Sequence, residues 1–324
     1  MSEGTGALGA EARTLRQLDQ AAARPPKKRS SRRTKEVGLA ALLLLPSIVV
    51  FGVFVYYPLI TIFYRGLYES PPFPNAPSEY VGLSQYADVL TGHDFLNSLE
   101  VTFLFALYTV PTGIVLGIIM AVLANQRLRG IAVFRTIFSS TVATSVAVAS
   151  VIFFTLLNPQ VGLFTYWLED VVDTSTGGIL QDPDTALIAV SLTTIWQNLG
   201  LTFILMIAGL QAIPDDLYEA ASIDGAGPFR QFFRVTLPML SPTIFFSAVV
   251  GLIVAFQSFG QIDILTQGGP IDKTNVLTYF IYTAAFQEGD SGLSSVLAVA
   301  LFAIVLILTL VQFRVLERRV FYGD

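Results

Sequence analysis

The chain has 324 residues, of which 53% are hydrophobic and 13% are charged, and its formal net charge is −5. A soluble domain carries about 25% charged residues, so this excess of apolar residues excludes an ordinary soluble core and indicates a membrane protein. The absence of cysteine also excludes disulfides, thiolate metal sites and cysteine nucleophiles.

Residues 1–36 are predicted to form a disordered basic tail. They are rich in Ala, Arg, Lys, Pro and Gly and include the run RPPKKRSSRRTK, which has nothing to pack into a core. The apolar run from Val37 to Phe63 that follows is longer than the apolar region of a cleaved secretory signal. It is therefore predicted to be an uncleaved membrane span.

Further apolar stretches complete an all-α membrane protein of six transmembrane helices, each about 20 residues or longer. The predicted spans cover residues 37–63, 101–124, 131–157, 186–212, 241–264 and 294–313. Within them, Gly113 and Gly117 form a GxxxG pattern that favours close helix packing, and Pro46, Pro58 and Pro111 are expected to kink or loosen their helices. The only histidine, His93, lies between two spans and is expected to be a solvated loop residue.

The distribution of basic residues orients the spans. All the Lys and Arg residues except Arg65 and Lys273 fall in the N-terminal tail, the C-terminal segment or the loops on the same side. Cytoplasmic segments carry the excess of Lys and Arg. Both termini are therefore predicted to be cytoplasmic.

The segment from Gln211 to Pro242, QAIPDDLYEAASIDGAGPFRQFFRVTLPMLSP, is predicted to be a cytoplasmic helix-turn-helix. Pro214 followed by two aspartates is a helix start signal, and Gly225, Gly227 and Pro228 are expected to end that helix. A surface of small residues flanked by aromatic ones suits docking into a groove of another protein. The alternative is an interfacial helix that lies on the bilayer.

Part of this segment, EAASIDGAGPFRQFFRVTLPMLSP, resembles the EAA loop in the permeases of binding-protein-dependent ABC importers. The resemblance covers nearly all of residues 37–320 and includes TQGGP at 266–270, which is typical of carbohydrate-type, maltose-permease-like members. The stretches LQDPDTALIAVSLTTIWQNLG, IDGAGPFRQFFRVTLP and VQFRVLERRVFY most resemble the first permease subunit of sn-glycerol-3-phosphate systems. The residues that match the EAA pattern are Glu219, Ala220, Ala221, Asp224, Gly225, Leu237 and Pro238.

The resemblance implies a type I ABC importer permease fold in a bacterial inner membrane, with the loop 213–240 as its ATPase-coupling element. It implies a heterodimer with a second permease subunit, two ATPase subunits that bind ATP and Mg, and an extracytoplasmic solute-binding protein, without nucleic acid. The implied cargo is sn-glycerol-3-phosphate or glycerophosphodiesters such as glycerophosphocholine. Glu219 would contact the ATPase, Ala220, Ala221 and Gly225 would allow close approach, and Asp224 would brace the turn or act as a local cap.

No GxxxxGK[ST] motif occurs in the chain, so it is expected to bind no nucleotide by that route and to be a non-catalytic subunit. Polar residues within spans are the candidates for a translocation path, because they are costly in lipid. Hydrogen bonding between helices explains them equally well. These candidates are Trp196, Gln197, Asn198, Gln257, Ser258, Gln261 and Asp263. Gln257 and Gln261, four residues apart, are expected on one helical face.

Three other interpretations remain. A permease of the same family could carry another sugar or disaccharide. An ion-coupled secondary transporter would need carboxylates or broken helices near the bilayer midplane, and only Asp263, near a span end, is a candidate. A membrane-embedded enzyme would need convergent His, Cys or paired acidic groups, which the sequence does not offer.

Overall fold

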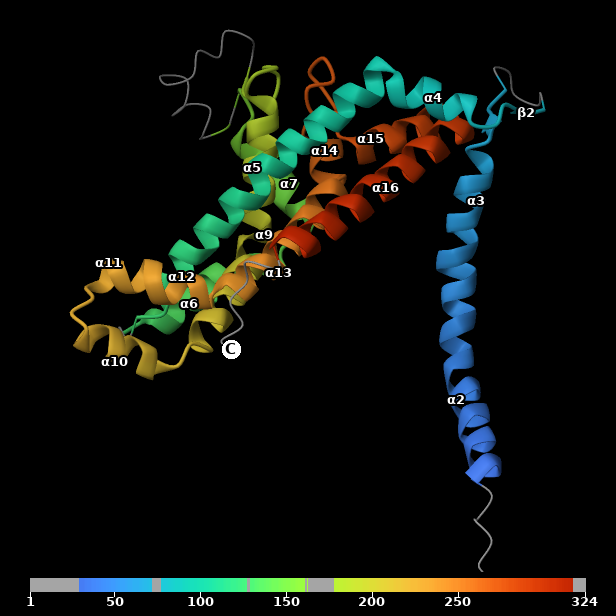
Figure 1. Ribbon diagram of the computed structural model, residues 1–324. Helices are drawn as coiled ribbons and strands as arrows, with labels where there is room; N and C mark the ends of the chain where they lie inside the picture. Colours follow the sequence, from blue (N-terminus) through green and yellow to red (C-terminus); the bar gives the residue numbers. More distant parts are fainter. Residues whose placement is uncertain (1–28, 72–76, 127–128, 161, 163–177, 317–324) are drawn as a thin grey trace, which may run out of the picture. The chain divides into compact units, whose positions relative to one another are not determined.

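The computed structural model describes residues 29–71, 77–126, 129–160, 162 and 178–316 (Figure 1). The chain divides into two compact units, Met1–Ile60 and Thr61–Asp324. The second unit holds the helix bundle and every candidate site residue.

The first unit is a helix that begins at Arg29, within the segment predicted as a tail. α2 (Arg29–Phe51) continues through a π-helical turn, η1 (Gly52–Tyr56), into α3 (Tyr57–Arg65). The wide turn accommodates Pro58, whose ring would clash with the carbonyl four residues earlier, inside η1. The predicted loosening at Pro58 is therefore confirmed. The remainder of the predicted tail, residues 1–28, lies outside the described residues.

The described part of the second unit is helical apart from two short strands, which pair antiparallel with Tyr68 opposite Tyr80. Its elements after α3 are β1 (Tyr68–Glu69), β2 (Glu79–Tyr80), α4 (Ser84–Thr91), α5 (His93–Ala124), α6 (Ile131–Ser139), η2 (Ser140–Ala143), α7 (Val146–Leu156), α9 (Ala186–Gln211), α10 (Asp215–Ile223), α11 (Pro228–Gln231), η3 (Phe232–Thr236), α12 (Leu237–Met239), α13 (Ser241–Phe256), α14 (Gly260–Leu265), α15 (Leu277–Tyr282), η4 (Thr283–Gln287) and α16 (Ser291–Leu316).

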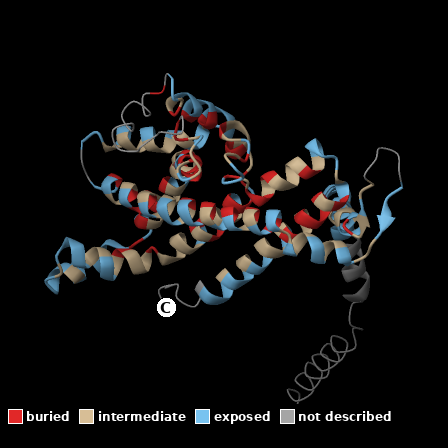
Figure 2. Ribbon diagram, turned by 90° about the horizontal axis from the view of Figure 1, so that it is seen from above, coloured by how far each residue is buried: buried red, intermediate tan, exposed pale blue. Residues whose placement is uncertain are grey.

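The centre of the bundle is the packing of α5 against α9, with α13 against both. The two helices approach closely at Gly117, where a Cβ atom would lie 2.6 Å from Cγ2 of Thr202 on α9. Gly113, the other glycine of the GxxxG pattern, would meet nothing within 4 Å if it carried a Cβ. Phe105 on α5 and Phe203 on α9 are fully buried, and Figure 2 shows buried residues where the helices of the second unit pack together.

One bend lies inside the third predicted span, 131–157, and another lies where the loop 213–240 meets the fifth predicted span, 241–264. The segments Ile131–Ala143 and Val146–Leu156 meet at 104°, and Pro228–Met239 and Ser241–Phe256 meet at 61°. At the first bend Ser145 is extended, and its side chain accepts a backbone hydrogen bond from the first turn of α7. Such a cap starts a new helix in a new direction.

By length and composition, four of the described helices can cross a membrane, and up to six spans result if each bent pair is one crossing. The fourth predicted span, 186–212, agrees closely with α9. The helix that contains the second predicted span, α5, begins earlier, at His93, because Gly92 is an extended N-cap and Asp94 lies in the first turn of α5. His93 is thus the first residue of a helix and not a loop residue, although its side chain is 93% exposed.

Candidate functional site

The predicted coupling loop, 213–240, contains the expected short helix at its outer end. Pro214 is the extended N-cap of α10, and Asp215 and Asp216 occupy its first turn, where carboxylates complement the positive end of the helix dipole. In Figure 1 this helix and α11 project as a hairpin from one end of the bundle, away from α4 and α15. The start signal read from the sequence is therefore confirmed.

The end of α10 is a Schellman turn built on Gly225. The Ala226 N–H donates to the carbonyl of Ala221 at 2.9 Å, and the Gly225 N–H donates to the carbonyl of Ser222 at 3.0 Å. Gly225 has a φ of +75°, which L side chains rarely adopt, and a Cβ there would meet nothing within 4 Å. Within this chain, Gly225 is therefore required by backbone conformation, not by a close neighbour. Asp224 is the C-cap residue, and its side chain is exposed.

The second limb of the loop returns the chain to the bundle through α11, the π-helical turn η3 and α12. Here too a π turn lies just before a proline. The ring of Pro238 would clash with the carbonyl of Arg234, four residues earlier and inside η3. Leu237 and Pro238 lie on α12, partly buried at the base of the loop. Leu237 and Pro238 therefore do not lie on α10, although the EAA pattern includes them together with residues of that helix.

The outward surface of the loop combines a carboxylate, small residues and bare apolar side chains. Glu219 and Ala220 are exposed on α10, and Ala221 is half-buried. Ile223 is 87% exposed and Phe229 is 78% exposed, so two large apolar side chains stand at the tip, which Figure 2 shows as exposed. Large apolar groups in water mark a surface that a partner covers.

The predicted path residues divide into three environments. The first is a chain of hydrogen bonds between helices. Ser258 Oγ donates to Oε1 of Gln261 at 3.3 Å, Gln261 Nε2 donates to Oε1 of Gln197 at 3.0 Å, and Gln197 Nε2 donates to the carbonyl of Thr144 at 3.3 Å. These three hydrogen bonds connect the break between α13 and α14 to the bend before α7. The described contacts agree with the alternative of helix-to-helix bonding for these residues.

The second group of predicted path residues takes no part in these hydrogen bonds and does not line the cavity in the bundle. The predicted common face of Gln257 and Gln261 is wrong, because α13 ends at Phe256 and the chain is irregular before α14. Gln257 is consequently exposed whereas Gln261 is 4% exposed. Trp196 packs its ring against Phe153, with centroids 5.5 Å apart.

Asp263 lies on α14, where it is half-buried. Burial and, secondarily, the negative charge of Asp263 raise the pKa of the Tyr279 phenol on α15 above its usual range. That phenol therefore remains neutral at physiological pH. Among the described residues, no group of three or more His, Cys, Asp or Glu side chains is arranged to hold a metal ion.

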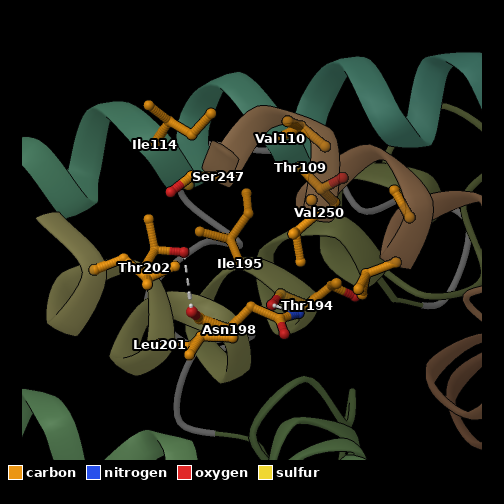
Figure 3. A pocket seen from close by; sticks show the side chains of 15 residues that line it. Thr109, Val110, Ile114, Thr194, Ile195, Asn198, Leu201, Thr202, Ser247 and Val250 are labelled. Carbon is orange, nitrogen blue, oxygen red and sulfur yellow. Dashed lines mark hydrogen bonds between the residues drawn. The ribbon is translucent and has the colours of Figure 1, made fainter. Parts of the chain in front are cut away.

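The third environment is a cavity of about 70 Å³ between α5, α9 and α13, drawn in Figure 3. Asn198 is the one predicted path residue that lines it, and no lining residue is charged. The hydroxyls of Thr109, Thr194 and Thr202 donate to carbonyls of their own helices. The Oγ of Ser247, in contrast, is buried without a hydrogen-bond partner in the described structure. A buried hydroxyl without a partner requires an explanation, and a solute or water in the cavity would supply one.

Four of these polar cavity residues were not predicted, although the sequence carries a signal for two of them. Thr194 and Thr202 lie four residues before and after the predicted Asn198 in α9, and such spacing puts polar groups on one helical face. Thr109 and Ser247 carry no comparable pattern, because no other polar residue follows them at a spacing of four in their spans. Only the packing of three helices identifies them as neighbours.

Comparison with known proteins identifies the family. Residues 113–322 match the model described as "binding-protein-dependent transport system inner membrane component". The chain is 36% identical over 290 residues to the sn-glycerol-3-phosphate transport system permease protein UgpA of Agrobacterium fabrum, covering 88% of this chain and 97% of the relative. It is 35% identical over 285 residues to the UgpA of Yersinia enterocolitica, covering 88% and 96% of the two chains.

Solved structures confirm the fold. A chain of a bacterial ABC transporter that imports the acidic polysaccharide alginate matches with a TM-score of 0.76 and 21% identity, covering 90% of this chain and 99% of the other. The same transporter in complex with its alginate-bound periplasmic protein matches with a TM-score of 0.76. The chain belongs to the family of inner membrane components of binding-protein-dependent transport systems and is a permease subunit of an ABC importer.

Proposed function

We propose that this permease subunit imports sn-glycerol-3-phosphate or glycerophosphodiesters such as glycerophosphocholine. The observation that carries the proposal is the similarity to the sn-glycerol-3-phosphate permeases, which extends along nearly the whole length of both chains. The subunit pairs with a second permease, and a solute-binding protein delivers the substrate from outside. Two ATPase subunits bind ATP and Mg on the cytoplasmic side, so this chain is itself non-catalytic.

In this assembly α10 is the coupling helix. Its exposed Glu219 offers a polar contact to the ATPase, and the small Ala220 and Ala221 permit close approach. The bare side chains of Ile223 and Phe229 are suited to fill an apolar cleft in that partner, as buried anchors do in stable interfaces. The basic residues Arg230 and Arg234 in the same loop support a cytoplasmic location, with both termini on that side.

The cavity between α5, α9 and α13 is the proposed part of the translocation path that this subunit contributes. A volume of about 70 Å³ holds a few water molecules, so the helices must separate before a solute passes. Asn198 and the unpartnered Ser247 would meet solute hydroxyls as that happens. Transport by alternating access would open and close this cavity.

A second candidate substrate is a neutral sugar or disaccharide. The specific observation in its favour is that no charged side chain lines the cavity. A phosphate would have to be met there by neutral donors or by the partner permease, because this chain presents no Lys or Arg at that point.

The substrate is tested by calorimetric titration of the purified solute-binding protein of the same system with sn-glycerol-3-phosphate, glycerophosphocholine and maltose. Binding of the phosphorylated compounds alone supports the proposal. Preference for maltose would contradict it and favour the neutral-sugar alternative. Uptake of the preferred compound into proteoliposomes that contain the whole complex then connects binding to transport.

The coupling role is tested with Glu219→Trp. The bulky ring is expected to displace the ATPase, so that less ATPase co-purifies with the permease and uptake falls. Glu79→Trp is the matched control, since Glu79 is also exposed but lies on β2 at the opposite end of the bundle. Full co-purification and full uptake in Glu219→Trp would refute the coupling role of α10.

A further inference from the structure

The loop 213–240 has two limbs, α10 and the segment that returns through α11, η3 and α12, and Gln231 connects them by hydrogen bonds. Gln231, the last residue of α11, extends its amide back to the end of α10. Its Nε2 atom donates to Oγ of Ser222 at 2.9 Å and to the carbonyl oxygen of Ala226 at 2.9 Å. One side chain thus satisfies a hydroxyl in the last turn of α10 and a carbonyl in the turn that follows it.

A second hydrogen bond between the two limbs lies closer to the bundle. The Tyr218 hydroxyl and Oγ1 of Thr236 are 3.1 Å apart, in a partly buried contact between α10 and the end of η3. Between these two contacts, Ser222 Oγ donates to the backbone carbonyl of Tyr218 at 2.8 Å. Tyr218 and Ser222, one turn apart on α10, thus each hydrogen-bond to the returning limb.

These bonds have a mechanical consequence. α10 has nine residues, and an isolated helix of that length is marginal in water. A partner that pushed on an unsupported helix would tilt or unravel it before moving the bundle. Fastening α10 to the limb that continues through α12 to α13 makes the loop a single body, so that displacement at α10 reaches the bend before α13.

We infer that Gln231 is a positioning residue that fixes α10 to the returning limb of the loop and thereby transmits movement of the ATPase to α13. The inference rests on the proposed coupling role of α10. It assigns to Gln231 no contact with the ATPase or the substrate. Its effect is on how much transport each hydrolysed ATP produces.

The test uses the whole complex in proteoliposomes and the variant Gln231→Met, which preserves side-chain length but removes both hydrogen bonds. Loss of one typical hydrogen bond lowers the equilibrium constant for the hydrogen-bonded loop about fivefold, and loss of both bonds lowers it by at least that factor. We expect the ATPase to remain bound, the number of substrate molecules imported per ATP to fall about fivefold or more, and the amides of α10 to exchange with deuterium faster by a similar factor. Gln211→Met is the matched control, because Gln211 is exposed at the end of α9.

Ser222→Ala is the second variant. It removes one of the two acceptors at an exposed helical position, where Ala favours the helix, and it is expected to lower the import ratio by a smaller factor. Wild-type import per ATP and wild-type exchange in Gln231→Met would overturn the inference, as would loss of the ATPase from that variant. Failure of Glu219→Trp to affect assembly or uptake would instead refute the coupling role itself, so the two failures are distinguishable.

Discussion

The amide of Gln261 donates a 3.0 Å hydrogen bond to the amide oxygen of Gln197, which joins α14 to the middle of α9 from 64 residues away in the chain. Gln261 is 4% exposed, so its amide has little access to water if the bond is lost. Because Gln197 also bonds to Thr144 at the 104° bend, the pair fixes two helix breaks to one continuous helix.

The first prediction concerns this pair. Gln261→Leu leaves the half-buried Gln197 oxygen without its donor and the buried Ser258 hydroxyl without its acceptor, and a buried polar group without a partner costs about 1–3 kcal/mol. The thermal transition of the purified complex should fall accordingly. The double variant Gln197→Leu/Gln261→Leu should lose less stability than the sum of the single variants, because the interaction is shared. Strict additivity would contradict a direct bond, and the exposed Gln257→Leu serves as the control.

The second prediction compares two glycines two residues apart. Gly225→Ala introduces a Cβ at a φ of +75°, a left-handed conformation that costs about 1–2 kcal/mol. It should weaken ATPase co-purification and uptake, and Gly225→Asn should be milder because Asn tolerates this conformation. Gly227→Ala should be close to neutral, since Gly227 has a φ of −69° and open space around its Cα.

If Gly227→Ala were instead as harmful as Gly225→Ala, the partner's surface and not the backbone would set the requirement for glycine. Co-purification of the ATPase, measured at equal permease expression, provides that comparison.

The third prediction concerns the contact of α5 with α9. Gly117→Ala should destabilise the complex, because its Cβ would lie 2.6 Å from Cγ2 of Thr202 and overpacking typically costs about 1–3 kcal/mol. Gly113→Ala should be tolerated, as a Cβ there meets nothing within 4 Å. Adding Thr202→Ser removes the opposing methyl and should restore much of the thermal stability. An unrescued double variant would mean that the helices do not meet at this point.

The fourth prediction concerns the cavity. Ser247→Ala removes a buried hydroxyl that has no partner in the described structure, so folding stability should be unchanged or slightly higher. Transport should nevertheless weaken, with a raised KM for uptake, if the hydroxyl meets the solute. Ser247→Val, which fills the cavity, should lower the maximal rate as well. Unaltered uptake kinetics in both variants would remove Ser247 from the path.

Much of the fold follows from local sequence. The hydrophobic runs predict α9 and the general position of the other spans, and Pro214 with its two aspartates predicts the start of α10. These features depend on residues close together in the chain. The predicted span 101–124 does not include the start of α5, where polar and charged residues interrupt the apolar run, and the extended Gly92 cap shows where this helix begins.

What the sequence did not predict depends on tertiary contacts. Gln257 and Gln261 have helical spacing, but α13 ends between them. Gln231 is an unremarkable glutamine in the sequence, and its importance comes from Ser222 and Ala226, which the turn at Gly225 brings into reach. Hydrophobic periodicity carries no information about such contacts, since they form only after two elements have packed.

The hydrogen bonds between α10 and α11 also bear on biogenesis. Because the Schellman turn and the Gln231 amide complete the loop from within this chain, its binding surface is preorganised before any ATPase arrives. A preorganised surface loses little conformational entropy when it binds. With α10 in its proposed coupling role, newly inserted permease is therefore expected to bind its ATPase without first folding this loop.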